Sequence, residues 1–154
     1  KKQKRYAEAD SLYRLALAID TAKRGPQHPY VAGDWRSIGE LNRAWDRPEQ
    51  ALEAFSQETA LRRPNGPSPT LARALYNQGT VLTERGRYAA AEDRLQDARA
   101  VHAQLDEHSS SLAIDLRTAF ATLYADQGRS QEAQRWRERA EHPDSVYSDE
   151  RTRK

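Results

Sequence analysis

The 154-residue sequence contains no cysteine and no methionine. The missing cysteines exclude disulfides, thiolate metal sites and a cysteine nucleophile, although they do not fix the compartment. No apolar run approaches the length of a membrane-spanning helix, roughly 18 residues, and no signal-peptide core is present. Because the chain starts with lysine and lacks methionine, we interpret it as a piece of a longer protein. We also expect a cytoplasmic location.

A strong excess of charge of one sign is also missing. The 25 lysines and arginines face 23 aspartates and glutamates, and a net charge of +2 is weak support for a nucleic-acid partner. The hydrophobic fraction of 37% is low and the charged fraction of 31% is high, which is typical of an elongated protein with much surface. Leucine, alanine, tyrosine and tryptophan nevertheless recur too regularly for a disordered chain.

Patterns that would indicate catalysis or a cofactor are absent. The four histidines lack the His-x-x-x-His spacing that places two metal ligands on one helical face, and they are His28, His102, His108 and His142. No glycine-rich phosphate loop occurs, and the serines at 109–111 lack the glycines of a nucleophile elbow. Their position predicts a helix cap instead. We therefore expect no enzyme, no metal and no cofactor.

What the sequence does contain is an internal repeat. Small residues recur at spacings of 42, 40 and 42 positions, and they are Ala9, Ala51, Ala91 and Ala133. In most units a large residue follows four positions later and a small residue seven positions later, a rhythm that marks one face of a helix. Gly39 and Gly79 lie twelve positions before two of these alanines. They predict a second helix that crosses the first at close range.

The periodicity of apolar residues and the positions of capping and turn residues predict seven helices, over residues 3–23, 29–44, 48–62, 69–84, 88–106, 111–126 and 130–141. His28 and Ser68 each precede a proline, as a capping residue does, while Asp46 and Glu49 indicate a capping box. Strand-type alternation is missing throughout. We predict that residues 142–154 form a polar, flexible tail.

At this point the residues resemble a known family. The series Trp35, Ile38, Gly39, Ala51 and Phe55 looks like a tetratricopeptide repeat, and the next unit repeats it. The long period resembles the 42-residue subtype of kinesin light chains. The resemblance implies an all-α, right-handed solenoid of antiparallel helix pairs. Residues 1–25 would then be the second helix of an incomplete first repeat, and 26–141 three tetratricopeptide-like pairs.

Some positions depart from the family pattern. Polar or charged residues stand where the family prefers apolar or small ones, at Asn42, Glu58, Arg117 and Arg137. The incomplete first unit also leaves an apolar stripe without its partner helix, formed by Tyr6, Ala9, Tyr13 and Ala16. Such a stripe is costly to leave in water. We expect an upstream helix or a second chain to cover it, so a homo-oligomer through this first helix is one expectation for partners.

In this family the first helix of each pair lines the concave side of the solenoid. The resemblance therefore implies a set of inward-facing residues, which are Arg36, Glu40, Arg43, Arg73, Tyr76, Asn77, Thr80, Glu84, Asp115, Thr118 and Thr122. The resemblance also places Ser37, Thr83 and Asp126 on this side. The spacing itself supports three helical faces, formed by positions 36, 40 and 43, by 73, 76, 77, 80 and 84, and by 115, 118, 122 and 126. The face is polar, unlike a core stripe.

The chemistry of this face suits a polypeptide. Asn77 matches a position where groove asparagines of this family hydrogen-bond the backbone of a bound peptide. Tyr76 is the one large aromatic side chain and predicts an anchor. The arginines predict pairing with acidic side chains of a ligand, and they are Arg36, Arg43 and Arg73.

The function that follows is a non-catalytic scaffold that binds a peptide or partner protein on the concave face, without a membrane partner. Two alternatives stay open. One is a structural module that assembles with itself. The other is an RNA-binding helical repeat, which the basic runs at 1–5, 135–139 and 151–154 support weakly because they lie at the two ends of the chain.

Overall fold

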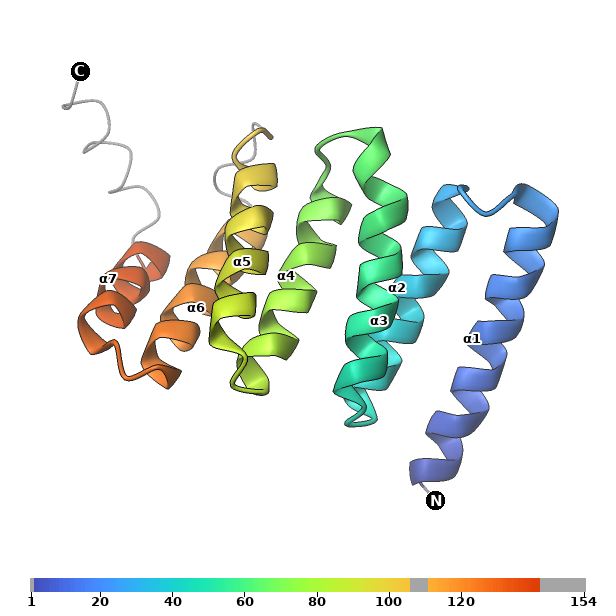
Figure 1. The fold of residues 1–154 in the computed structure, drawn as a ribbon, viewed down its shortest axis with the longest axis horizontal. Coiled ribbons are helices and arrows are strands. Elements are labelled where there is room, and N and C mark those ends of the chain that lie inside the picture. Colours follow the sequence, from blue (N-terminus) through green and yellow to red (C-terminus); the bar gives the residue numbers. More distant parts are fainter. Residues whose placement is uncertain (1, 106–110, 142–154) are drawn as a thin grey trace.

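The computed structural model describes residues 2–105 and 111–141. Seven α-helices account for most of these residues and stand side by side in a row (Figure 1). They are α1 (Lys2–Arg24), α2 (Pro29–Ala44), α3 (Pro48–Arg62), α4 (Pro69–Glu84), α5 (Tyr88–His102), α6 (Ser111–Asp126) and α7 (Ser130–Glu141). No strand occurs in the described ranges. The predicted all-α solenoid of helix pairs is confirmed.

One predicted helix is too long and several expectations fall outside the described residues. The helix predicted over 88–106 ends at His102, and the chain turns at 103–105. A single 3₁₀ turn, η1 (Arg63–Asn65), follows α3. The predicted tail at 142–154, His108 and the first two serines of 109–111 lie outside the described residues. Among the described helices, none combines the length and apolar character needed to cross a bilayer.

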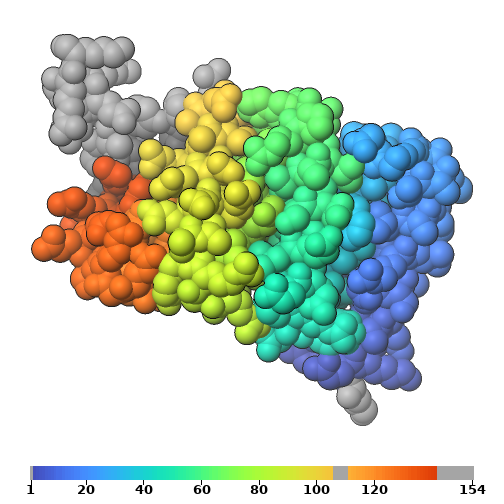
Figure 2. All heavy atoms as spheres, viewed as in Figure 1, coloured from blue at the N-terminus to red at the C-terminus, as the bar shows by residue number. Residues whose placement is uncertain are grey.

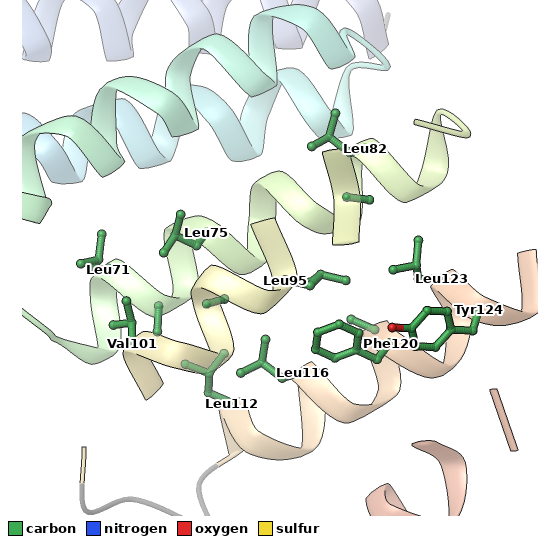
Figure 3. Close-up of a cluster of buried hydrophobic side chains, with 14 of the residues drawn as sticks. Leu71, Leu75, Leu82, Leu95, Val101, Leu112, Leu116, Phe120, Leu123 and Tyr124 are labelled. Atoms are coloured by element: carbon green, nitrogen blue, oxygen red, sulfur yellow. The ribbon is translucent and has the colours of Figure 1, made fainter. Parts of the chain in front are cut away.

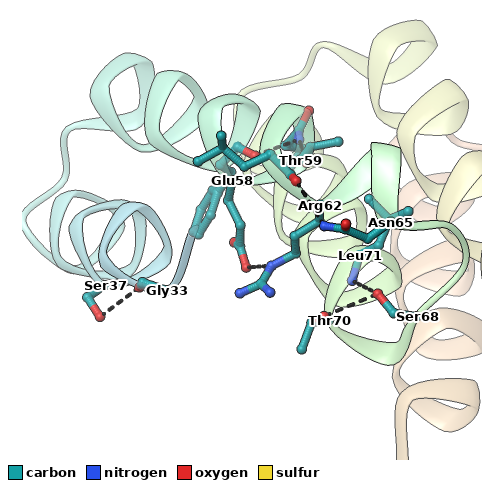
Figure 4. Close-up of polar contacts among 12 residues, drawn as sticks. Gly33, Ser37, Glu58, Thr59, Arg62, Asn65, Ser68, Thr70 and Leu71 are labelled. Atoms are coloured by element: carbon teal, nitrogen blue, oxygen red, sulfur yellow. Dashed lines mark hydrogen bonds and ion pairs between the residues drawn. The ribbon is translucent and has the colours of Figure 1, made fainter. Parts of the chain in front are cut away.

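Two of the predicted helix caps, at His28 and Ser68, are confirmed. The Nδ1 atom of His28 accepts a hydrogen bond from the backbone N–H of Tyr30 at 3.2 Å. The hydroxyl of Ser68 accepts one from the backbone N–H of Leu71, also at 3.2 Å (Figure 4). Each bond satisfies a donor that the first turn of a helix otherwise leaves without an acceptor.

The predicted capping box at Asp46 is wrong. The residue before α3 is Arg47, and its side chain makes no capping hydrogen bond. Asp46 has a left-handed backbone with φ of 57°, as do Gly86 and Gly128 in the corresponding turns of the later pairs. Because that turn geometry directs the Asp46 carboxylate to the next repeat, it accepts a hydrogen bond from Nη2 of Arg85 at 2.5 Å. An aspartate tolerates this backbone better than most residues.

The two helices of a pair lie close together because a glycine on one meets a bulky side chain of the other. A Cβ atom placed on Gly39 would lie 2.5 Å from Cε1 of Phe55, and one placed on Gly79 would lie 2.6 Å from Cδ2 of Leu95. Such distances are far below the separation at which carbon atoms attract. The predicted close crossing at both glycines is therefore confirmed.

The largest apolar cluster lies between α4, α5 and α6 (Figure 3). Leu75 and Leu95 are completely buried there, and the ring of Phe120 stacks on Trp136 of α7 with centroids 4.5 Å apart. The last pair thus joins the core through aromatic contact. Arg117, a departure from the family pattern, is half-buried in α6, and one of its terminal nitrogens has no hydrogen-bond partner.

Polar groups are also buried where α3 meets α4. Glu58 is 0% exposed and occupies the place that alanine takes in the later repeats. One of its oxygens accepts a hydrogen bond from Nε of Arg62 at 2.7 Å (Figure 4), and the other has no partner. Burial raises the pKa of the Glu58 carboxyl, although the charge of Arg62 acts in the opposite direction. This carboxylate therefore costs the fold stability at neutral pH.

The helix α1 is the least buried, and most of its exposed apolar side chains are not the ones that were predicted. Tyr6 is half-buried because its ring stacks on Trp45, the residue that follows α2, with centroids 5.8 Å apart. The apolar side chains that remain most exposed are Leu12 at 65%, Leu15 at 57% and Ile19 at 43%, together with the predicted Tyr13 at 41%. No residue of α1 is buried.

We predict that Gly79→Ala lowers the free energy of unfolding by about 1–3 kcal/mol, because the new methyl group collides with Leu95. Gly33→Ala is the control. A Cβ atom on that α2 glycine meets nothing within 4 Å, so the better helix propensity of alanine should raise stability by about 0.5–1 kcal/mol. Urea unfolding followed by circular dichroism measures both. Equal stabilisation by the two substitutions would contradict the close-contact account.

Candidate peptide-binding groove

The first helices of the three complete pairs, α2, α4 and α6, carry the residues predicted to face inward. Figure 2 views the molecule from the side on which α3 and α5 lie in front, and α2 and α6 lie behind them in the same view (Figure 1). Apolar side chains of α2, α4 and α6 face the second helices, so polar side chains are left for the remaining face. Two adjoining hollows open on that face.

The first hollow, of about 220 Å³, lies where α2, α4 and α6 end. Its floor includes Ala119, and hydroxyl groups and carboxylates line the rest. The lining residues are Arg43, Tyr76, Thr80, Thr83, Glu84, Thr118, Ala119, Thr122 and Asp126. A volume of this size is below the roughly 300–1,000 Å³ typical of sites for drug-sized ligands, and it suits a single side chain.

The second hollow lies between α2 and α4 and shares Arg43 and Glu84 with the first. The other lining residues are Glu40, Ala44, Phe55 and Asn77. We refer to the residues lining the two hollows together as the groove. Of the eleven residues predicted for the site, the groove brings together Glu40, Arg43, Tyr76, Asn77, Thr80, Glu84, Thr118 and Thr122.

Two of the predicted arginines already have partners within the chain. Arg43 donates to the Glu84 carboxylate, and Nη1 of Arg73 donates to Oδ2 of Asp115 at 2.6 Å. Each pair joins two neighbouring repeats. The expectation that these arginines await an acidic ligand therefore loses its support. The sequence did carry a signal for the pairs, because the partners stand 41 and 42 positions apart, which is one repeat.

Arg36 is one of three predicted residues that the two hollows do not include, together with Arg73 and Asp115. It lines neither hollow, and its charge instead favours the ionised form of the buried Glu58, lowering the pKa that burial raises. Phe55, in contrast, was expected only in the core. Its fully buried ring also forms part of the groove between α2 and α4, which no sequence signal indicated.

Tyr76 stays a protonated hydrogen-bond donor at neutral pH. Burial raises the pKa of its phenol, and the nearby Asp115 carboxylate raises it further. The guanidinium of Arg73 lies over the ring with its carbon 5.2 Å from the centroid. This contact and the Arg73–Asp115 pair fix the ring at one side of the first hollow.

Asn77 differs from every other polar residue of the groove. The residue is only 8% exposed, yet no hydrogen bond to its side-chain amide occurs among the described residues. The next residue, Gln78, shows the usual arrangement, because its amide nitrogen donates to the Thr59 hydroxyl at 2.7 Å and to the carbonyl of Phe55 at 3.1 Å. The Asn77 amide atoms are not among the buried atoms that lack a partner, so they are accessible from the groove and a ligand can bond them there.

No group of three or more potential metal ligands occurs in the part of the chain that the structure describes. The groove offers hydrogen-bonding groups, carboxylates, one guanidinium and the rings of Tyr76 and Phe55. These groups can bind the backbone and side chains of a polypeptide.

We predict opposite effects for the two neighbouring amides of α4. Asn77→Leu should leave the free energy of unfolding unchanged or raise it by up to about 1 kcal/mol, because no hydrogen bond is lost. Gln78→Leu should lower it by about 1–2 kcal/mol, because the Thr59 hydroxyl and the Phe55 carbonyl lose their donor. Chemical denaturation of the two variants side by side makes the comparison. A loss at Asn77 as large as that at Gln78 would show that the Asn77 amide is structural.

A comparison with solved structures supports the fold described above. Among solved structures, the chain is similar to the crystal structure of BtubC (BKLC) from P. vanneervenii, with a TM-score of 0.80 and 24% sequence identity. The match covers 90% of this chain and 56% of that one, so this chain spans just over half of the other protein's length. At this identity the likeness shows the fold alone. No curated protein matches the chain.

The family comparison covers nearly all of the described residues. A family model for the tetratricopeptide repeat matches residues 1–63 and 70–141. The matched ranges contain the four repeat alanines and both close-contact glycines on which the resemblance rested. The chain belongs to the tetratricopeptide repeat family.

Proposed function

We propose that this chain is a non-catalytic interaction module that binds an extended peptide segment of a partner protein in the groove. The observation that carries the proposal is the side-chain amide of Asn77, which lines the groove, stays accessible there and has no hydrogen-bond partner among the described residues, although the residue as a whole is only 8% exposed. A side-chain amide has donors and an acceptor, so it can satisfy both polar groups of one peptide unit. Tetratricopeptide repeats typically mediate protein–protein interaction, which supports the same conclusion.

The arrangement of the groove favours an extended ligand. The two hollows lie one after the other across α2, α4 and α6 and share Arg43 and Glu84. A segment that crosses the helices can place its backbone at Asn77 and a side chain in the hollow beside Tyr76. A rigid hollow on a scaffold of packed helices keeps the ordering cost of binding low.

The absence of catalysis is part of the proposal. Proteins of this family generally act as non-catalytic scaffolds. The groove also offers no histidine beside a hydroxyl, and its threonine hydroxyls largely bond the carbonyls of their own helices. A nucleophile would need an adjacent base to accept its proton.

Selection from a displayed library of random peptides tests the proposal. We expect enriched peptides to bind the purified chain, and Tyr76→Ala with Asn77→Leu to weaken them by about tenfold or more. Asp93→Ala with Gln96→Ala, two exposed changes on α5, is the control and should leave affinity unchanged. Far-UV circular dichroism confirms that the variants stay helical. Undiminished binding by the Tyr76 and Asn77 double variant would remove the groove from consideration.

Self-assembly through α1 is the second candidate, because Leu12, Leu15 and Ile19 form an exposed apolar stripe on that helix. If a second copy covers the stripe, the mass measured by light scattering should rise with concentration. Leu12→Gln with Leu15→Gln should then restore the mass of a monomer. A monomer at all concentrations would reject this candidate and leave the peptide-binding proposal standing.

A further inference from the structure

We propose that the hollow at the ends of α4 and α6 takes an arginine side chain, so that the ligand of the groove is a basic peptide. The inference rests on the proposed function and adds the chemistry of the partner. It depends on four features of the described residues: the balance of charge, the helix ends, the direction of the hydroxyl groups, and the surfaces beside the carboxylates.

The charges of the groove do not balance. Its lining contains three carboxylates and one guanidinium, and the carboxylates are Glu40, Glu84 and Asp126. The guanidinium, Arg43, is already bound to Glu84. Asp126 is exposed at the rim and has no ion pair or hydrogen bond with any described residue. A cation from a ligand would therefore meet carboxylates and one neutralised pair.

Beside the first hollow, α4 and α6 end without a basic side chain in their last turn. The last turn of an α-helix favours a basic side chain because the carbonyl end of the helix is negative. Five of the seven described helices follow this rule: α1, α2, α3, α5 and α7. The exceptions are α4 and α6, which have no basic residue in the last turn and end at Glu84 and Asp126. Both ends line the hollow, and Arg43 already pairs with Glu84 at the end of α4. A cation bound beside Asp126 would supply the charge that the end of α6 lacks.

Three of the threonine hydroxyls of the hollow face the ligand as acceptors. The hydroxyls of Thr80, Thr83 and Thr118 donate to the carbonyls of Asn77, Gly79 and Ile114 at 2.9–3.0 Å. A hydroxyl has one proton, so each of these oxygens is left with lone pairs only. A ligand group that consists of donors alone matches these three oxygens. Guanidinium presents five N–H donors, more than any other side chain.

The surfaces beside the carboxylates suit the rest of an arginine side chain. Ala119 is buried at the floor and Tyr76 is half-buried at one side, so the methylene groups have apolar surface to cover. The Asn77 amide lies in the adjoining hollow and can hold the peptide backbone. Both hollows are then filled by one continuous segment.

Short peptides of known sequence provide the test. The probes are acetyl-Gly-Ala-Arg-Ala-Gly-amide and two versions in which citrulline or glutamate replaces the arginine. Citrulline keeps the shape of arginine and removes its charge. In ¹⁵N-labelled protein at low ionic strength, we expect the arginine peptide to shift the amide signals of Tyr76, Ala119 and Asp126. The citrulline peptide should bind about tenfold more weakly, and the glutamate peptide should cause no shift there.

Charge-neutral variants of the protein make the test specific. Asp126→Asn should weaken the arginine peptide by about five- to tenfold and bring its affinity close to that of the citrulline peptide. Asp93→Asn, the same change on exposed α5, should alter neither affinity beyond about twofold. Equal binding of the arginine and citrulline peptides, stronger binding of the glutamate peptide, or no binding of any would each overturn the inference.

The library selection separates this inference from the proposed function. Enriched peptides that carry arginine at one position would support both. Enriched peptides that are neutral or acidic, and that still depend on Tyr76 and Asn77, would overturn the inference and leave the proposed function in place. If no peptide is enriched, neither stands.

Discussion

The structure depends on the contact, in two of its three helix pairs, between a bulky side chain of the second helix and a glycine of the first helix. Phe55 on Gly39 and Leu95 on Gly79 bring the paired helices so close that a methyl group would not fit between them. Because the helices of a pair lie this close, their apolar faces pack against each other and against the next pair. The first helices then keep a polar face toward the groove.

Polar pairs one repeat apart complete the arrangement and decide what the groove offers. Arg43 with Glu84 and Arg73 with Asp115 join neighbouring repeats, so most charge on this face is already neutralised. Exposed pairs of this kind add little stability, about 0–1 kcal/mol each, but they fix the positions of side chains. The proposals on peptide binding rest on two groove side chains that have no partner among the described residues, Asn77 and Asp126.

The spacing of residues in the sequence predicted part of the groove but not its hydrogen bonds. The helical period placed Tyr76, Asn77, Thr80 and Glu84 on one face of α4, and the structure finds them together. Spacing could not show that Asn77 lacks a partner while Gln78 has two, because that depends on which helix faces each side of α4. Whether the groove binds a peptide stays a prediction, to be decided by the selection experiments.

The sequence by itself determined the all-α class, the repeat, the helix bounds to within a few residues and the two close glycine contacts. These properties are local or periodic, so a pattern of residue types specifies them. Only the tertiary structure decided that Asp46 closes a left-handed turn, that Glu58 is buried beside Arg62, and that the groove ends at α4 and α6 with more carboxylates than cations. The backbone of Asp46 and the pair Glu58–Arg62 are local, but the burial of Glu58 and the excess of carboxylates in the groove follow from how the helices pack, which no residue pattern specifies.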